Sequence, residues 1–164
     1  MIIVTVGTHE QPFDRLVGYM DRWAGSHDEE VIIQSGYSTI EPKNCKWQQF
    51  YRQDEMDRFI RDARIVITHG GPCCYNEVIH IGKVPIVVPR SHKLGEHVDD
   101  HQIEIGREFK RRVNNIILIE DIEDLGDAIE HYDEIVKGMI NNECPSHNAE
   151  FCKELSGIVD RLFE

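Results

Sequence analysis

Residues 64–89 read R-I-V-I-T-H-G-G-P-C-C-Y-N-E-V-I-H-I-G-K-V-P-I-V-V-P, and this stretch decides the fold of the chain. Ile65 to Ile67 form a short β-branched apolar run that predicts a buried strand, and Thr68 to Gly71 predict a turn after it. Pro72 suits the first position of a helix because its fixed φ is already helical and its missing N–H needs no intrahelical partner. The stretch therefore predicts a strand, a turn with two glycines and a helix.

The same stretch predicts where this helix ends and a second strand begins. Gly82 and Pro85 end the helix, and Ile86 to Val88 form a second apolar run. Similar patterns predict strands at residues 2–6, 31–33, 46–51 and 116–119, and helices after Pro12, at 54–63, from His97 or Val98 to 112, and at 122–140. Because short apolar strands alternate with helices, we predict an α/β fold in one domain, residues 1–164. It is a three-layer, Rossmann-like parallel sheet of about six strands with helices on both faces.

A final amphipathic helix is predicted from about residue 147. The segment from Asn141 to Ser146 breaks the preceding pattern, and apolar residues then recur at helical spacing. They are Phe151, Leu155, Ile158, Val159 and Leu162. Such a stripe is more often part of a protein's own core than a partner site, so the sequence favours core packing.

Composition and charge restrict the class of protein. The net charge of −12 over 164 residues argues against nucleic-acid binding and against unaided attachment to anionic lipid. The sequence shows no run of about 18 apolar residues and no signal peptide. Its five cysteines are an odd number and form no C-x-x-C pair, which indicates reduced thiols. We therefore expect a cytoplasmic protein.

The two glycines between the strand and the helix are a candidate anion site. Gly70 and Gly71 let a phosphate approach the backbone, and the free N–H groups of the helix start favour negative charge. Glu77, further along the same helix, is placed to accept hydrogen bonds from ribose hydroxyls. The pattern is equally compatible with a simple tight turn and a solvated glutamate.

The turn after the first strand, G-T-H-E-Q, is a second candidate site. Gly7 gives access to the backbone, Thr8 supplies a hydroxyl, and His9 and Glu10 are possible proton acceptors. A polar loop without chemistry fits the same residues. The turn lacks G-x-G-x-x-G, which argues against a nicotinamide or flavin dinucleotide.

The segment from His92 to Gln102 allows two different functions. His97 and His101 are four residues apart, so on a helix they would share a face as a zinc-binding pair does, with His92 or Glu96 as a third ligand. Val98 stands where a metalloprotease motif needs glutamate. Alternatively, Asp100, His101 and Gln102 hydrogen-bond sugar hydroxyls, or the segment is only the start of a surface helix.

Taken together, these motifs resemble the C-terminal, donor-binding half of the GT-B glycosyltransferases of family 28. The similarity extends to the short stand-alone forms, namely the catalytic subunit of the two-subunit N-acetylglucosaminyltransferase of the dolichol pathway and its bacterial exopolysaccharide counterparts. The matching stretches are V-G-T-H-E-Q-P-F-D-R-L-V (6–17), I-T-H-G-G-P-C-C-Y-N-E (67–77), K-V-P-I-V-V-P (83–89) and D-D-H-Q (99–102). Their order and spacing cover most of the chain.

The resemblance implies roles for these residues. His69 to Gly71 would hold the diphosphate of a UDP-sugar, Glu77 the ribose, and Asp100 to Gln102 would lie near the sugar. Gly7 to His9 would line the cleft where donor meets acceptor. The family's reaction uses a lipid-linked acceptor and needs neither a metal nor another cofactor. Cys73 and Cys74 depart from the small residues that are commoner there.

The resemblance also implies a partner. A GT-B enzyme has a second half that binds acceptor and membrane, for which 164 residues leave no room. We therefore expect a heterodimer with a membrane-anchored, acceptor-binding subunit, which recruits the chain to the cytoplasmic face of the membrane. The C-terminal helix is a candidate contact, and the isolated chain could self-associate through the same surface.

The sequence thus predicts the donor-binding, catalytic subunit of a two-subunit glycosyltransferase that moves a hexose from a UDP-sugar to a lipid-linked saccharide in polysaccharide synthesis. His9 is the candidate proton acceptor, and Arg90 or Lys93 would stabilise the departing UDP. One alternative is a non-catalytic nucleotide-binding regulatory or scaffold subunit. Another is a metal-dependent hydrolase that uses His97 and His101.

Overall fold

The computed structural model of the chain describes residues 1–139 and 148–161, and its centre is a parallel sheet of six strands in the order β3-β2-β1-β4-β5-β6. The strands are β1 (Ile2–Thr5), β2 (Val31–Gln34), β3 (Lys46–Gln48), β4 (Ile65–His69), β5 (Ile86–Val88) and β6 (Ile117–Leu118). All neighbouring strands pair in parallel, with Ile2 of β1 opposite both Val31 and Ile65. The predicted α/β fold with about six strands is confirmed.

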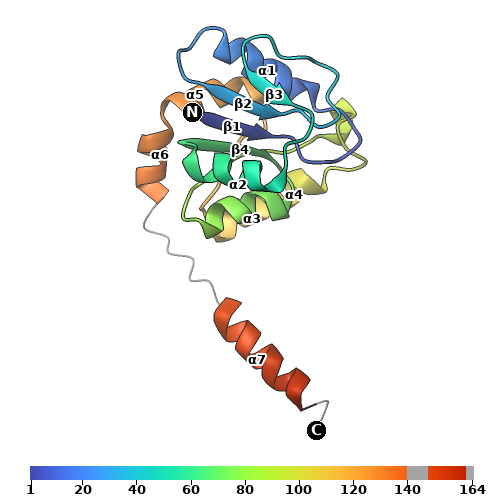
Figure 1. Cartoon of the computed structure of the whole chain (residues 1–164), viewed down its shortest axis with the longest axis vertical. Helices are drawn as coiled ribbons and strands as arrows, with labels where there is room; N and C mark the ends of the chain where they lie inside the picture. Colours follow the sequence, from blue (N-terminus) through green and yellow to red (C-terminus); the bar gives the residue numbers. More distant parts are fainter. Residues whose placement is uncertain (140–147, 162–164) are drawn as a thin grey trace.

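Helices cover both faces of the sheet and make it the middle of three layers (Figure 1). They are α1 (Asp14–Ala24), α2 (Gln53–Asp62), α3 (Pro72–His80), α4 (His101–Arg112), α5 (Leu125–Glu130), α6 (Tyr132–Met139) and α7 (Asn148–Asp160), with short 3-10 turns η1 (His92–Leu94) and η2 (Ile122–Asp124). Buried side chains of α1 and α5 pack on one face, against Ile2 and Val4, whereas α2 and α3 pack on the other, against Ile3 and Val66. Since both faces are buried, the central strands are apolar throughout, as the sequence predicts.

Several elements differ from their predicted bounds. β3 covers Lys46–Gln48 rather than 46–51. β4 continues through His69, which pairs with Val88 of β5, so His69 ends a strand rather than lying in a turn. α4 begins at His101 and not at His97 or Val98. The acidic helix predicted at 122–140 is divided into α5 and α6 at His131, where Tyr132 turns into the core and donates its hydroxyl to the Val84 carbonyl at 2.6 Å. Ile140 lies outside the described residues.

Lys83, in the K-V-P motif, caps the C-terminal end of α2 with its side chain. Its Nζ donates to the carbonyl oxygens of Ile60, Arg61 and Ala63 at 2.8, 2.5 and 2.6 Å. These carbonyls lie at or just after the helix end, where intrahelical donors are lacking, so one ammonium group satisfies three of them. The motif therefore ties α2 to the start of β5.

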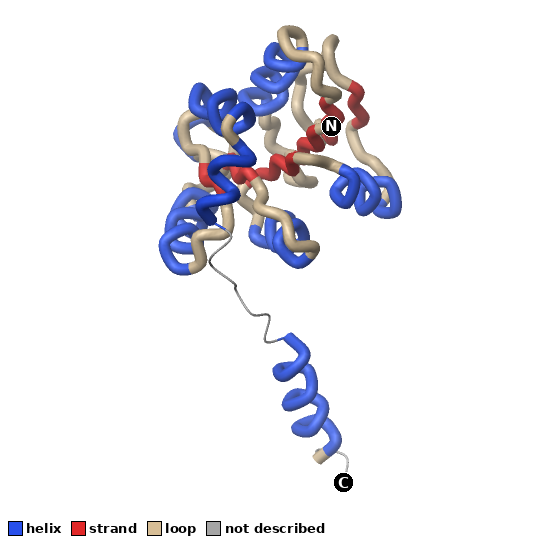
Figure 2. The backbone as a smooth tube through the Cα atoms, turned by 90° about the vertical axis from the view of Figure 1, so that its left-hand side faces the viewer, coloured by secondary structure: helices blue, strands red, loops and turns tan. Residues whose placement is uncertain are grey.

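The predicted C-terminal helix is α7, which stands apart from the sheet in both Figure 1 and Figure 2. Its apolar residues Phe151, Leu155, Ile158 and Val159 are 60%, 46%, 50% and 42% exposed. The expectation that this stripe packs into the protein's own core is therefore wrong, because no described residue covers it. The predicted break at Asn141–Ser146 and Leu162 lie outside the described residues. No helix in the described ranges is long and apolar enough to cross a membrane.

Candidate functional site

A pocket of about 410 Å³ opens where the carboxyl ends of β1 and β4 meet. From β1 the chain continues to β2 and β3 on one side, whereas from β4 it continues to β5 and β6 on the other. Ligands of open parallel sheets bind at this switch point, because the loops diverge there. The pocket is lined by Thr5, Gly7, Thr8, Gln34, Phe50, Tyr51, Gln53, Met56, Ile60, Thr68, His69, Cys74 and Glu77.

His69 lies between two glycines at this switch point. A Cβ atom on Gly7 would lie 2.5 Å from His69 Cε1, and one on Gly71 would collide with His69 Nε2. Gly7 also has a φ of 76°, which side chains rarely adopt. Gly71, from the predicted phosphate-binding turn, and Gly7, from the predicted turn where donor meets acceptor, are therefore required first of all to make room for the imidazole of His69.

Burial determines the protonation of His69. Desolvation, followed by the positive charge of Arg90, lowers the pKa of His69 to about 4, so the ring is neutral near neutral pH. Its Nδ1 and the hydroxyl of Thr68 are buried without a hydrogen-bond partner among the described residues. Both residues line the pocket, and an unpartnered buried polar atom beside a pocket is a candidate group for contact with a ligand.

Sequence reasoning missed Gln34 and Tyr51 on the opposite wall. Gln34 Nε2 donates to Thr5 Oγ1 at 3.2 Å, and its Oε1 accepts the backbone N–H of Tyr51 at 3.2 Å. The Tyr51 ring packs edge-on against Phe59, with centroids 5.2 Å apart. A polar glutamine at the end of an otherwise apolar strand was the available signal, because such a side chain lies at the carboxyl edge of the sheet.

α3 contributes the third wall. Gly71 and Pro72 begin the helix, and its first turn holds no acidic residue that would compensate the positive end of the dipole. Glu77 is exposed on the pocket wall, where a ribose could reach it. Cys74 lies beside it, and burial raises the pKa of its thiol to about 11. A protonated Cys74 is a packing residue rather than a nucleophile.

Arg90 does not lie in this pocket, which corrects its predicted contact with the donor. The side chain is fully buried, stacks over Phe13 at 4.8 Å, and donates to backbone carbonyls. The accepting oxygens are those of Val6 at 2.8 Å, Gln11 at 2.7 Å, Pro12 at 3.4 Å and Glu96 at 3.0 Å. Desolvation lowers the pKa of Arg90 to about 10, which leaves it charged at neutral pH. Arg90 therefore holds the loops after β1 and β5 together.

Gln102 and Asp100 also bind the protein's own backbone. Gln102 is 4% exposed, and its Oε1 accepts the Arg90 N–H at 3.1 Å. A Cβ on Gly70 would lie 2.8 Å from Gln102 Cβ, so Gly70 allows this close packing. Asp100 Oδ1 accepts the His92 N–H at 2.8 Å. The sugar contacts of Gln102 and Asp100 stay a prediction. In the structure, both residues position the loop after β5.

A buried ion pair supports the same loop. Arg15 of α1 binds Glu96 through two hydrogen bonds of 2.9 Å, from Nε to Oε1 and from Nη2 to Oε2. Glu96 Oε2 also accepts the Ser91 N–H at 3.0 Å. Sequence reasoning had Glu96 as a possible metal ligand, and this pairing contradicts that role, since both carboxylate oxygens bind Arg15.

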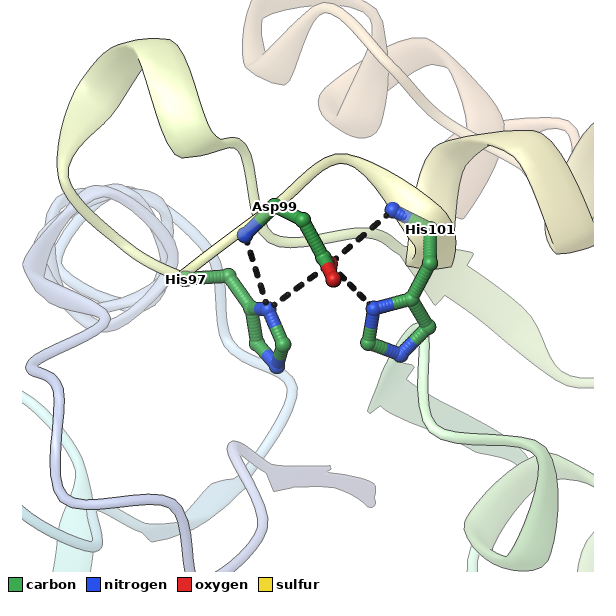
Figure 3. A group of neighbouring side chains, drawn as sticks. All are labelled: His97, Asp99 and His101. Carbon is green, nitrogen blue, oxygen red and sulfur yellow. Dashed lines mark hydrogen bonds and ion pairs between the residues drawn. The ribbon is translucent and has the colours of Figure 1, made fainter.

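His9, His97 and His101 gather beside the pocket, although they come from different segments. The His97 ring lies edge-on to His9, with centroids 4.5 Å apart, and to His101 at 4.7 Å. Asp99 lies between His97 and His101 (Figure 3). The predicted pair of histidines on one helix face is wrong, because Asp99 and Asp100 bind nearby backbone N–H groups and delay the helix to His101.

His9, the predicted proton acceptor, borders both the cluster and the turn after β1. Its Nδ1 accepts the Gln11 N–H over a long 3.4 Å contact. A neutral ring in this arrangement carries its proton on Nε2. As the predicted proton acceptor, His9 would use Nδ1 after this weak contact opens, or Nε2 in the other tautomer.

Comparison with protein families agrees with this architecture. The model of the glycosyltransferase family 28 C-terminal domain matches residues 1–149. The chain therefore belongs to glycosyltransferase family 28, whose C-terminal domain binds a nucleotide-sugar donor, and the predicted family is confirmed. No curated protein matches the chain significantly.

Proposed function

We propose that the chain is the donor-binding, catalytic subunit of a two-subunit glycosyltransferase. It would transfer a hexose from a UDP-sugar to a lipid-linked saccharide in polysaccharide synthesis, without a metal cofactor. The observation that carries the proposal is the pocket between β1 and β4, which brings Gly7, Thr8, His69 and Glu77 together in a family 28 domain.

The pocket walls fit the parts of a nucleotide. The start of α3 offers the diphosphate an uncompensated helix dipole beside the glycine backbone of Gly70 and Gly71. Glu77, one turn further along, would accept hydrogen bonds from the ribose hydroxyls. The base would then lie between Gln34 and Tyr51, where aromatic and amide groups are available for stacking and hydrogen bonding. In this arrangement the sugar would lie toward His9 and His101.

Exposed apolar groups support a partner on the acceptor side. Leu94 and Val98, in the loop that leads to His97, are 58% and 66% exposed. The stripe on α7 is also exposed, and isolated helices of this length are marginal in water without packing. We propose that a membrane-anchored, acceptor-binding subunit covers both surfaces and recruits the chain to the cytoplasmic face of the membrane.

Co-expression with such a membrane subunit tests the proposal. Labelled sugar should move from the UDP-sugar into the lipid fraction only when both chains are present. A panel of UDP-sugars, scored by thermal stabilisation of the isolated chain, identifies the donor first. Absence of stabilisation by UDP and by every UDP-sugar would contradict donor binding.

Replacing His9 separates a catalytic from a scaffold subunit. His9→Ala should lower the transfer rate by about 10²–10⁴-fold if His9 is the proton acceptor, with UDP affinity unchanged. The matched control is His27→Ala, because His27 lies away from the pocket and stacks on Trp23. A chain that binds UDP and its partner, yet whose complex never transfers sugar, would be the non-catalytic subunit.

A further inference from the structure

We propose that His97, Asp99 and His101 form a binding site for a zinc ion, separate from the nucleotide pocket. The potential ligand atoms of these three side chains all lie within 4.8 Å of one another. Figure 3 shows both imidazole rings turned toward the carboxylate of Asp99. Two imidazoles and one carboxylate are a common set of protein ligands for zinc.

The separations suit a tetrahedral ion. His97 Nδ1 lies 3.2 Å from Asp99 Oδ1, and His101 Nδ1 is hydrogen-bonded to the same oxygen. Two ligands bound tetrahedrally at about 2.0–2.1 Å from zinc lie about 3.3 Å apart. The His97–Asp99 pair is already at this separation, although His97 Nδ1 would have to give up the 3.4 Å hydrogen bond that it accepts from the Asp99 N–H. His101 would have to withdraw from Asp99 as its proton is replaced by the metal.

The backbone that carries these ligands is held from both sides. Before His97, the Glu96 carbonyl binds Arg90 and the Glu96 carboxylate binds Arg15. After Asp99, the Asp100 carboxylate accepts the His92 N–H. Held ligands lose little conformational entropy when an ion binds, which favours affinity.

An entry route and an open coordination position complete the site. The His97 side chain is 9% exposed, whereas those of Asp99 and His101 are 57% and 43% exposed, so an ion can reach the ligands from solvent. Three protein ligands leave a fourth position for water or for a further side chain. His9, whose ring packs against His97, is one candidate for that position.

This site goes beyond the proposed transfer reaction, which is proposed to proceed without a metal. It shares His101 with that reaction and, where His9 takes the fourth coordination position, His9 as well. Zinc bound there would withdraw His101 from the sugar. The test uses the isolated chain without nucleotide, so its result is independent of whether the chain transfers sugar.

The experiment is a titration of the metal-free full chain, carrying no histidine tag, with zinc by calorimetry and with cobalt by visible absorption. The chain should bind about one equivalent of either ion, and cobalt should give the absorption of a four-coordinate site. His101→Ala and Asp99→Asn should each weaken binding by at least about tenfold, since each loses a ligand. His80→Ala, an exposed histidine on α3, should bind like the wild type.

Two results would overturn the site. One is unchanged zinc affinity in both His101→Ala and Asp99→Asn, each shown by circular dichroism to be folded. The other is a near-ultraviolet cobalt–thiolate band that disappears in Cys73→Ser/Cys74→Ser, because the metal would then bind the adjacent cysteines at the start of α3.

Discussion

The two sides of the sheet's carboxyl edge use their polar groups differently. On the β5 side, both terminal nitrogens of Arg90 donate to backbone carbonyls and Arg15 binds the Glu96 carboxylate, so among the Arg90 nitrogens only Nε is without a partner among the described residues. On the β1–β4 side, the Thr68 hydroxyl and His69 Nδ1 are buried without a partner among the described residues. Satisfied groups stabilise the fold, whereas unsatisfied ones are available to a ligand. The β5 side is therefore the support, and the β1–β4 side is the binding surface.

The largest loss of stability is expected when the hydrogen bonds of Arg90 on the β5 side are removed. Arg90→Met should lower the free energy of unfolding by about 3–5 kcal/mol, because it leaves several buried carbonyls without donors. Urea unfolding measures the change. Arg58→Met, at an exposed arginine on α2, should stay within about 0.5 kcal/mol of the wild type. Equal stability of the two variants would show that Arg90 does not hold these loops.

A second test adds a methyl group to Gly7, which lies against His69 in the pocket. Gly7→Ala should cost about 2–4 kcal/mol, since it adds backbone strain and a collision with His69. Gly82→Ala is the matched control, because Gly82 has a similar φ of 79° but nothing within 4 Å of an added Cβ. It should cost only the strain, about 1–2 kcal/mol. Similar losses in both would mean that the contact with His69 is unimportant.

The third test measures how stability depends on pH, because His69 is neutral in the folded chain whereas Arg90 is charged. The pKa of His69 is about 4 in the folded chain, below the ordinary histidine value of 6.5, so the unfolded chain binds more protons between these values. Stability is therefore fully present above about pH 6.5 and falls as the pH drops toward 4, by about 2–3 kcal/mol. Urea unfolding at several pH values should show a flatter dependence in His69→Gln. An unchanged slope would contradict the buried neutral ring.

The smallest effect on stability is expected at the open side of the pocket. Glu77→Ala should leave the free energy of unfolding within about 0.5 kcal/mol of the wild type, because Glu77 is exposed. Its affinity for UDP should fall about tenfold or more, since a charged acceptor of hydrogen bonds is lost. Calorimetry measures the UDP affinity, with Glu104→Ala on α4 as the control variant. An unchanged affinity of Glu77→Ala for UDP would contradict the assignment of Glu77 to the ribose.

Much of the fold could be predicted because apolar runs and breakers act locally. The strands at 65–67 and 86–88 and the helix start at Pro72 were predicted from neighbouring residues alone, and the structure confirms them. The start of α4 was predicted too early because side-chain bonds from Asp99 and Asp100 compete with helix formation. Those bonds depend on where η1 lies, which no local pattern contains.

The site was predicted less completely than the fold. The motifs located Gly7, Thr8, His69 and Glu77, which do line one pocket. They did not reveal Gln34 and Tyr51, which reach the pocket from β2 and from the loop after β3. They also suggested an exposed role for Arg90, although its partners lie up to 84 residues away in sequence.

The sequence by itself determined the parallel α/β fold, the family and the position of the glycine turns, because periodicity and turn residues act over a few neighbours. Only the tertiary structure decided which polar groups are free. Whether Arg90 meets solvent or carbonyls, and whether His69 is neutral, depends on burial by distant segments. The stripe on α7 shows the same principle, since an apolar pattern predicts a face but not what covers it.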